Sequence, residues 1–365
     1  MEQKVDGINV LKFAGAFIAF LIGAGFATGQ EVFQYFAAYG YEGIWVALGT
    51  LLGLGYAGGD VIAVGYSVKF DNTNDIYRYY CGKYIGGFYD YFSTIFIYMS
   101  YIVMLAGAGA TVAQHYGMAP LTGGLIMLAL SVGTVVLGLG KIVDIIGCLG
   151  PLIVLIALGV GVGAIMMNPA GISVGAELTK NPEFLSTITR VGNNWIASVA
   201  SYVGFCMLWL AAFLAALGQK ANSTKEALTG TSLGAIGFTL GALILMLGFL
   251  AHMSEVSTAD IPSLIIAAQI WAPVASAFCI IIMAGIYTTA VPLLWSVSAR
   301  YAQEKTPKFY ALTIGLGIVA CVIAFSVNFK TIVNVIYGIN GYVGILLIVF
   351  MLAKRFGLSK LGMNK

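Results

Sequence analysis

The chain has 365 residues, of which 60% are hydrophobic and only 9% are charged, and its mean hydropathy is +0.94. So few charged side chains cannot cover the surface of a soluble protein of this length, which excludes a soluble domain. The net charge of +3 is small and gives no reason to expect nucleic acid as a partner. We therefore expect an integral membrane protein in contact with the lipid bilayer.

Apolar segments of about 20 residues, the length at which a helix crosses the hydrocarbon core, recur along the chain. We predict ten of them, at residues 9–38, 43–68, 86–114, 120–139, 141–167, 193–217, 230–252, 273–299, 309–328 and 331–353. An even number leaves both chain ends on one side. If that side is the cytoplasm, every Lys and Arg falls inside except Lys180, Arg190 and Lys330, as the positive-inside rule requires. The prediction is a multi-pass protein of the plasma (inner) membrane with both termini cytoplasmic.

The ten segments divide into two halves of five, residues 9–167 and 193–353, within a single transmembrane domain that covers 1–365. The fifth segment begins with the sequence IVDII at 142–146, and the tenth begins with a counterpart, IVNVI, at 332–336. Because five crossings separate the two copies, the second half would be inverted in the membrane. An inverted repeat of this kind is typical of secondary transporters.

The first segment is interrupted near its middle by the run GAGFATGQE, residues 23–31. Backbone groups freed by a break at that depth must face protein or a water-filled cavity, so the run marks a candidate binding site. The corresponding sixth segment carries ASYVGF at 200–205. We expect it to unwind around Gly204, the alternative being that its small residues only let helices pack closely.

The run from Phe20 to Glu31, together with the five-plus-five plan, resembles the YkvI-like membrane protein family, within the amino acid, polyamine and organocation superfamily. The resemblance implies the leucine-transporter-like fold, an all-α integral membrane protein with ten transmembrane helices in a 5+5 inverted repeat and discontinuous helices 1 and 6. It also implies a solute at the midplane, bound by free backbone groups at the breaks. Matched by motif, the solute-binding positions of the first break are Gly23, Ala24, Gly25, Phe26 and Thr28.

Members of that fold carry amino acids, amines, nucleobases and osmolytes, so the resemblance implies only a class of solute. Half-helix ends favour a carboxylate at free N–H groups and a cation at free carbonyls, and a zwitterion such as an amino acid would satisfy both. Further candidates for contact with the solute are Glu31, Tyr98, Tyr101, Ser201, Tyr202, Gly204 and Phe205, with Tyr337 and Asn340 as weaker ones. The aromatic rings could act as thin gates or stack on an amine, and core packing is the alternative for each ring.

Two adjacent hydroxyl residues near the middle of the eighth segment indicate a sodium site. Gly285, Thr288 and Thr289 stand at i, i+3 and i+4 and share a helix face, so their oxygens can converge on a monovalent cation. The resemblance adds the carbonyls of Ala19 and Ile22 as the remaining ligands. The alternative is that both threonines bond back to carbonyls one turn earlier. We expect a sodium ion and no organic cofactor.

Two acids, Glu31 and Asp60, are expected within the membrane itself, where a carboxylate costs about 2.5 to 3.5 kcal/mol on insertion scales and is a functional hypothesis by default. Glu31 could bind a substrate amine, carry a coupling proton or only satisfy backbone amides near the outer surface. Asp60 could belong to an inner gate or a proton path. No Lys or Arg lies deep in any segment, so we expect a hydroxyl, amide or water as the partner of Asp60.

These features predict a secondary active transporter, a sodium-coupled symporter of a small zwitterionic or amine solute, with an amino acid as the first choice, that works by alternating access. The alternatives are a proton-coupled transporter or exchanger that uses Glu31 or Asp60, and a solute receptor of the same fold that does not transport. We expect no enzyme, because His115 and His252 lie near segment ends and no nucleophile has a histidine close in sequence. The solute, the stoichiometry, the direction and the oligomeric state stay open.

Overall fold

The computed structural model describes residues 5–137, 155 and 158–357. Within this part all regular elements are helices. They are α1 (Gly7–Leu21), α2 (Ala24–Ala27), α3 (Gln30–Tyr35), the 3-10 helix η1 (Ala37–Glu42), α4 (Gly43–Val68), α5 (Asp75–Tyr116), α6 (Pro120–Leu137), α8 (Gly171–Leu178), α9 (Pro182–Thr187), α10 (Trp195–Gly218), α11 (Thr224–Ala251), α12 (Met253–Val256), α13 (Pro262–Ile270), α14 (Ala272–Tyr301), α15 (Pro307–Ala324) and α16 (Phe329–Arg355).

Eight of the described helices are long and apolar enough to cross a membrane, as predicted for an integral membrane protein. They correspond to the second, third, fourth, sixth, seventh, eighth, ninth and tenth predicted segments. The first predicted segment is the series α1, α2 and α3. Only the end of the fifth is described, as the helix Leu158–Met167, which meets α8 at a bend of 100°. The IVDII motif lies outside the described residues, so the repeat stays a prediction.

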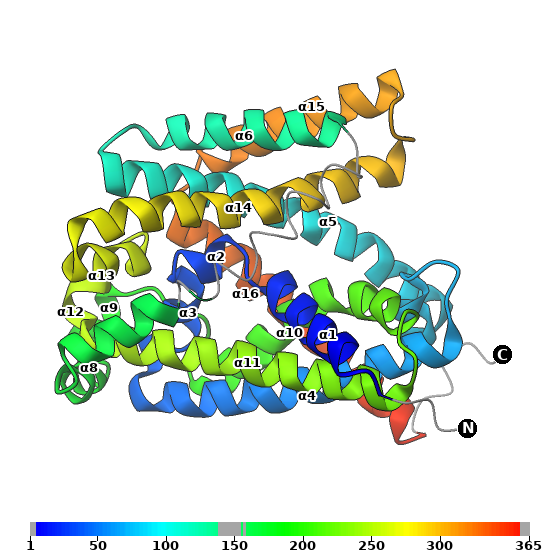
Figure 1. Ribbon diagram of the computed structural model, residues 1–365, viewed down its shortest axis with the longest axis horizontal. Coiled ribbons are helices and arrows are strands. Elements are labelled where there is room, and N and C mark those ends of the chain that lie inside the picture. Colours follow the sequence, from blue (N-terminus) through cyan, green and yellow to red (C-terminus); the bar gives the residue numbers. More distant parts are fainter. Residues whose placement is uncertain (1–4, 138–154, 156–157, 358–365) are drawn as a thin grey trace.

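The long helices form two layers (Figure 1). One layer contains α1, α4, α10 and α11, the other contains α5, α6, α14 and α15, and α16 contacts both α10 and α5. Each half of the chain thus contributes its first two predicted segments to one layer and its third and fourth to the other. An internal two-fold repeat would give this arrangement.

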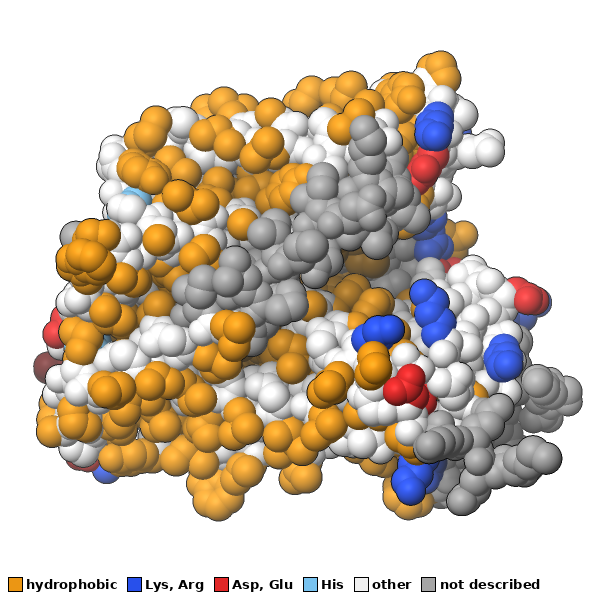
Figure 2. All heavy atoms as spheres, viewed as in Figure 1, with side chains coloured by type: hydrophobic (Ala, Val, Ile, Leu, Met, Phe, Trp, Pro, Cys, Tyr) orange, Lys and Arg blue, Asp and Glu red, His pale blue; other side chains and the backbone are white. Residues whose placement is uncertain are grey.

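The start of α1 and the end of α16 lie at the same end of the molecule, which we call the basal end. There the backbone N–H of Asp6 donates to Glu226 at the start of α11 (3.0 Å), and Arg355 at the end of α16 pairs with Asp60 of α4 (3.1 Å). Most Lys and Arg side chains on the visible face gather at this end, and hydrophobic side chains cover the body of the molecule (Figure 2). The short helices α8, α12 and α13 lie at the opposite, apical end (Figure 1). Which end faces the cytoplasm stays a prediction.

The predicted break in the sixth segment is wrong, because α10 is helical from Trp195 to Gly218. Its small residues serve for close packing against α16. A Cβ atom at Gly204 would overlap the carbonyl oxygen of Gly341, and one at Gly344 would overlap the backbone of Gly204. Small residues let two membrane helices approach each other while each helix keeps its own hydrogen bonds, so this stretch has no reason to unwind.

A sharp bend divides α5. Gly82 has φ 74° and ψ −176°, a conformation that L side chains rarely adopt, and it separates residues 75–81 from the long membrane helix that follows. We call residues 75–81 the α5 arm. The arm lies at the basal end, where the hydroxyl of Tyr77 donates to the Leu208 carbonyl of α10 (3.0 Å) and so connects the arm to the other layer.

Candidate solute and cation site

The first segment is interrupted twice. After α1 ends at Leu21, Ile22 (ψ 91°) and Gly23 (ψ −164°) adopt extended conformations, and the four-residue helix α2 follows. Gly29 then turns the chain with a φ of 82°, and α3 begins. Glycine is needed at position 29 because a side chain at this positive φ would be strained. The structure therefore contains the first break that the sequence predicts.

Glu31 lies on α3 and is 1% exposed. The hydroxyl of Tyr202 donates to Glu31 Oε1 over 2.6 Å, whereas Oε2 has no hydrogen-bond partner among the described residues. Oε2 is adjacent to the backbone of Gly25, where a Cβ atom would lie only 2.6 Å from it. In the described part of the chain no Lys or Arg forms an ion pair with Glu31. A buried carboxyl group in this position needs either a further partner or a proton.

Aromatic rings surround this carboxylate. The ring of Tyr202 lies 4.9 Å from that of Tyr35, and Tyr337 stacks on Phe205 with 4.8 Å between ring centroids. The Tyr337 hydroxyl is buried and has no hydrogen-bond partner among the described residues. Glu31, Tyr202 and Phe205, all predicted near the solute, therefore lie together, and Tyr337, predicted as a weaker candidate, lies with them.

The predicted sodium ligands come together in part. Thr289 Oγ1 lies 3.4 Å from the Ile22 carbonyl oxygen and 3.2 Å from the Gly285 carbonyl oxygen, which joins α14 to the break. Thr288 Oγ1 also donates to the Gly285 carbonyl (2.8 Å), so both threonines make the back-bond of the alternative interpretation. Within the described residues the hydrogen bonds of α14 to the first segment reach Ile22 and not Ala19. Three neutral oxygens at the break form a donor set suited to a monovalent cation.

Other predicted residues of the first break have local roles. The Thr28 hydroxyl donates to the Gly25 carbonyl (3.2 Å) and accepts from the Gln30 backbone N–H (3.4 Å), so it stabilises the turn between α2 and α3. The Phe26 ring packs against Phe238 of α11, with 5.2 Å between centroids. These contacts shape the break.

Two predicted solute contacts lie elsewhere. The Tyr98 hydroxyl donates to the Leu316 carbonyl of α15 (2.9 Å), and the Tyr101 hydroxyl bonds Ser131 of α6 (2.8 Å). Both rings thus face away from the break, and the prediction that they touch the solute does not fit this structure. The face of α5 that meets the break carries small residues, since a Cβ atom at Gly107 would lie 3.2 Å from the Cβ of Ala24. The run LAGAGA at 105–110 was the available sequence signal for that face.

Ser201, another predicted contact, bonds helices to each other. Its hydroxyl lies 3.4 Å from the Gly338 carbonyl of α16 and 3.4 Å from the Tyr35 hydroxyl. Asn340, the weaker candidate on α16, is buried, and its side-chain oxygen has no partner among the described residues. Ser201 therefore extends the polar contacts around Tyr35 into the contact between α10 and α16.

The prediction for the partners of Asp60 is corrected. Its carboxylate accepts from the Tyr80 hydroxyl (2.7 Å), as expected, but it also pairs with Arg355 (3.1 Å). Arg355 lies at the end of the last helix, outside the predicted segments, so a search for a cation within the segments missed it. Asp60 thus belongs to the basal end and is not part of the break.

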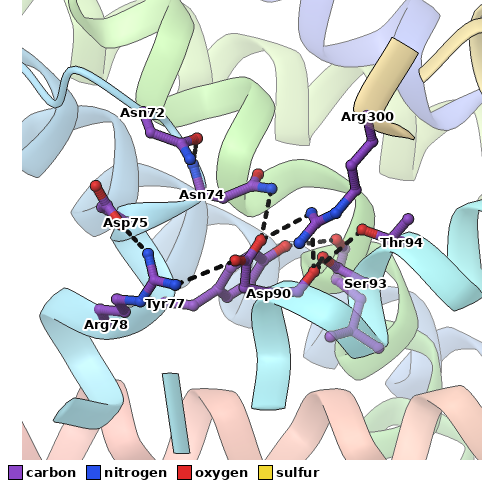
Figure 3. A network of polar contacts seen from close by, with 10 residues as sticks. Asn72, Asn74, Asp75, Tyr77, Arg78, Asp90, Ser93, Thr94 and Arg300 are labelled. Carbon is purple, nitrogen blue, oxygen red and sulfur yellow. Dashed lines mark hydrogen bonds and ion pairs between the residues drawn. The ribbon is translucent and has the colours of Figure 1, made fainter. Parts of the chain in front are cut away.

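A polar network at the basal end was not predicted (Figure 3). Asp90 of α5 accepts from Arg300 of α14 (2.9 Å) and from Asn74 (2.9 Å), and it pairs with Arg78 of the α5 arm (3.3 Å). Asp75 pairs with Arg78 in turn. The available signal was an acid, Asp90, four residues inside the third predicted segment. This network fixes the α5 arm to α14 at the basal end.

At the apical end α13 covers the break. The backbone N–H of Ser263, at the start of α13, donates to the Thr28 carbonyl (3.1 Å), and a Cβ atom at Gly29 would overlap the Ser263 hydroxyl. Nearby, Gln34 donates to the Lys330 carbonyl (3.2 Å) and accepts from Asn334 (3.2 Å). The start of α13 and the start of α16 therefore both contact the broken segment at the apical end.

No family model matches the chain. The chain is 22% identical over 357 residues to the uncharacterized membrane protein YkvI of Bacillus subtilis (strain 168), which covers 97% of this chain and 98% of that protein. It is 24% identical over 340 residues to the uncharacterized protein YyaD of the same organism, and this similarity covers 91% of this chain and 93% of that protein. Both similarities extend over almost the full length of the relatives.

Among solved structures, the manganese transporter of Eremococcus coleocola, in complex with an aromatic bis-isothiourea substituted compound, matches with a TM-score of 0.58 and 12% identity, over 98% of this chain and 81% of that chain. A mutant of the same transporter matches with a TM-score of 0.57 and 14% identity. The chain has the fold of a membrane transporter. Within the described residues no group of three or more His, Cys, Asp or Glu side chains could hold a metal ion.

Proposed function

We propose that the chain is a secondary transporter of the leucine-transporter-like class that moves a small amine or zwitterionic solute, an amino acid as the first choice, together with sodium. The observation that carries this proposal is the contact between the broken first segment and α14, in which Thr289 Oγ1 lies 3.4 Å from the Ile22 carbonyl and 3.2 Å from the Gly285 carbonyl. The break supplies backbone groups at membrane depth, and α14 supplies hydroxyl and carbonyl oxygens.

Sodium at these oxygens would connect the two layers, because Ile22 belongs to the layer of α1 and Thr289 to the layer of α14. A cation bound between two bodies favours the arrangement in which its ligands are close together. Alternating access then requires two movements. In one state α13 leaves the break and the site opens at the apical end, and in the other state the Asp90 network separates and the site opens at the basal end. Sodium binding would favour one of these states and thereby couple the ion to the solute.

Thermal unfolding of the purified protein in sodium chloride, compared with potassium chloride and choline chloride at matched ionic strength, tests the cation site. A ligand stabilises the state that it binds by RT ln(1 + [L]/Kd), so we expect a sodium-selective rise in Tm. Thr289→Ala should abolish this rise, and Thr288→Ala should reduce it. Thr231→Ala is the matched control, because Thr231 is buried and bonds back to Ala227 in the same way but lies on α11. A rise of equal size in Thr289→Ala would remove this site from the proposal.

Proton coupling is the second candidate, and one observation favours it: Oε2 of Glu31 is buried with no hydrogen-bond partner among the described residues. A proton on this oxygen could replace sodium as the coupling ion. If sodium has no effect on Tm, transport should be measured under a pH gradient, with Glu31→Gln as the variant that loses the response. Asp60, paired with Arg355 at the basal end, is the weaker proton carrier.

A further inference from the structure

The cluster around Glu31 contains a buried carboxyl group without an ion-pair partner among the described residues, and this bears on the chemistry of the solute. Glu31 is 1% exposed, and Tyr202 bonds only one of its two carboxylate oxygens. A buried charge is retained when a partner of opposite charge or a set of hydrogen-bond donors compensates it. Because no described Lys or Arg pairs with Glu31, the compensating group can come from the solute.

The surroundings of Oε2 suit an organic cation. A Cβ atom at Gly25 would lie 2.6 Å from Oε2 and 3.2 Å from the Tyr337 ring, so this oxygen and this ring border the same point of the break. Phe205 stacks on Tyr337, and Trp209 lies edge-on to it with 5.5 Å between centroids. The faces of aromatic rings attract ammonium groups, and an adjacent carboxylate adds a hydrogen-bond acceptor.

A second buried polar atom points to a ligand at the same place. The Tyr337 hydroxyl is 0% exposed and has no hydrogen-bond partner within the described part of the chain. Two such atoms in one cluster are unusual, because most buried polar groups are bonded. A solute with several N–H donors would satisfy both. An ionised Glu31 would repel an anionic solute, and no described basic side chain forms an ion pair with Glu31 or could receive a carboxylate beside it.

We infer that the solute carries an ammonium group, that Glu31 Oε2 is its counter-ion, that Tyr337 packs against it, and that a carboxylate on the solute is not required. This inference rests on the proposed transport function and narrows the substrate class from zwitterions and amines to molecules defined by their amine. It assigns Glu31 to solute binding in place of proton transfer.

Thermal unfolding with matched probes tests this inference. The probes form three sets, and within each set an amino acid, an amine and a carboxylic acid share one carbon skeleton. The sets are valine, isobutylamine and isovalerate; phenylalanine, phenethylamine and 3-phenylpropionate; and glycine, methylamine and acetate. All are measured at a constant sodium chloride concentration. We expect at least one amine to raise Tm by about 2 to 4 °C at saturation and its carboxylic acid to have no effect. Glu31→Gln should weaken amine binding about 30-fold or more. Tyr337→Phe, which keeps the ring, should weaken it less.

The sodium response separates failure of this inference from failure of the proposed function. In Glu31→Gln the sodium-dependent rise in Tm should persist, which also shows that the variant is folded. Glu226→Gln is the matched control, since Glu226 is buried but accepts from the backbone N–H groups of Asp6 and Asn222 at the basal end. Three results would each overturn the inference. They are stabilisation by a carboxylic acid, no response to any of the amines, and unchanged amine binding in Glu31→Gln. Amine binding without any sodium effect would uphold it and contradict sodium coupling.

Discussion

Gly25 shows how a single residue determines the site. It is the position that leaves room for the Glu31 carboxylate, because a Cβ atom there would lie 2.6 Å from Oε2 and 3.1 Å from the Glu31 Cβ. The sequence indicated this glycine by its place in the run at residues 23–31. It could not show that the acid six residues later folds back onto it, because that contact depends on the turn at Gly29.

Gly25→Ala should therefore affect binding more than folding. The added methyl group displaces the end of a flexible side chain, and we expect a loss of stability of about 1 to 3 kcal/mol, typical of a small insertion into a packed core. The amine response of Tm should disappear, because the carboxylate no longer lies at the break. Gly55→Ala on α4 is the control, since a Cβ atom there meets no atom within 4 Å. An unchanged amine response in Gly25→Ala would show that Glu31 does not bind at this position.

At the scale of single elements, the sequence predicted where helices lie better than which face each helix presents. Tyr98 and Tyr101 were predicted near the solute, but their hydroxyls bond α15 and α6, and these partners are set by packing that no local pattern contains. The prediction of a break in the sixth segment was wrong for a related reason. Glycine in a membrane helix permits both a break and a close approach, and only Gly341 on α16 distinguishes the two at Gly204.

Ion pairs hold the α5 arm in place. Asp90→Asn keeps the volume of the side chain but removes the charge that pairs with Arg300 and Arg78. Loss of charged hydrogen bonds typically removes about 1.5 to 3 kcal/mol each, so the arm should detach more often. Cys81, the last residue of the arm, is 1% exposed and should then react faster with a maleimide.

Peptide mass spectrometry identifies the labelled cysteine in this experiment. Glu177→Gln is the control, because it breaks a pair with Lys180 in which both side chains are largely exposed. Such surface pairs contribute about 0 to 1 kcal/mol, and this one is at the apical end, so Cys81 labelling should not change. Equal labelling in Asp90→Asn and the unaltered protein would show that the network does not hold the arm in place.

At the scale of the whole molecule, eight of the predicted apolar segments are long apolar helices in the described part of the chain, because hydropathy and length alone define membrane helices. Their arrangement in two layers was not predicted. The network at the basal end could not be predicted, since Asp90 and Arg300 are 210 residues apart in sequence. The contact of Thr289 with Ile22 was found only through a resemblance, and the structure brings these two residues together across the layers. Long-range contacts between layers are the part of the fold on which coupling depends, and they are the part that sequence patterns leave open.

Uptake into sealed vesicles tests the central claim most directly. The protein is reconstituted into liposomes, and entry of the radiolabelled amine that gives the largest rise in Tm is followed under an inward sodium gradient or an equal choline gradient. We predict accumulation above the equilibrium level with sodium alone, which is lost in Thr289→Ala and in Glu31→Gln and kept in Thr231→Ala. Equal uptake in sodium and choline would contradict sodium coupling. Binding of the amine without any entry into the vesicles would contradict transport itself and identify the protein as a receptor.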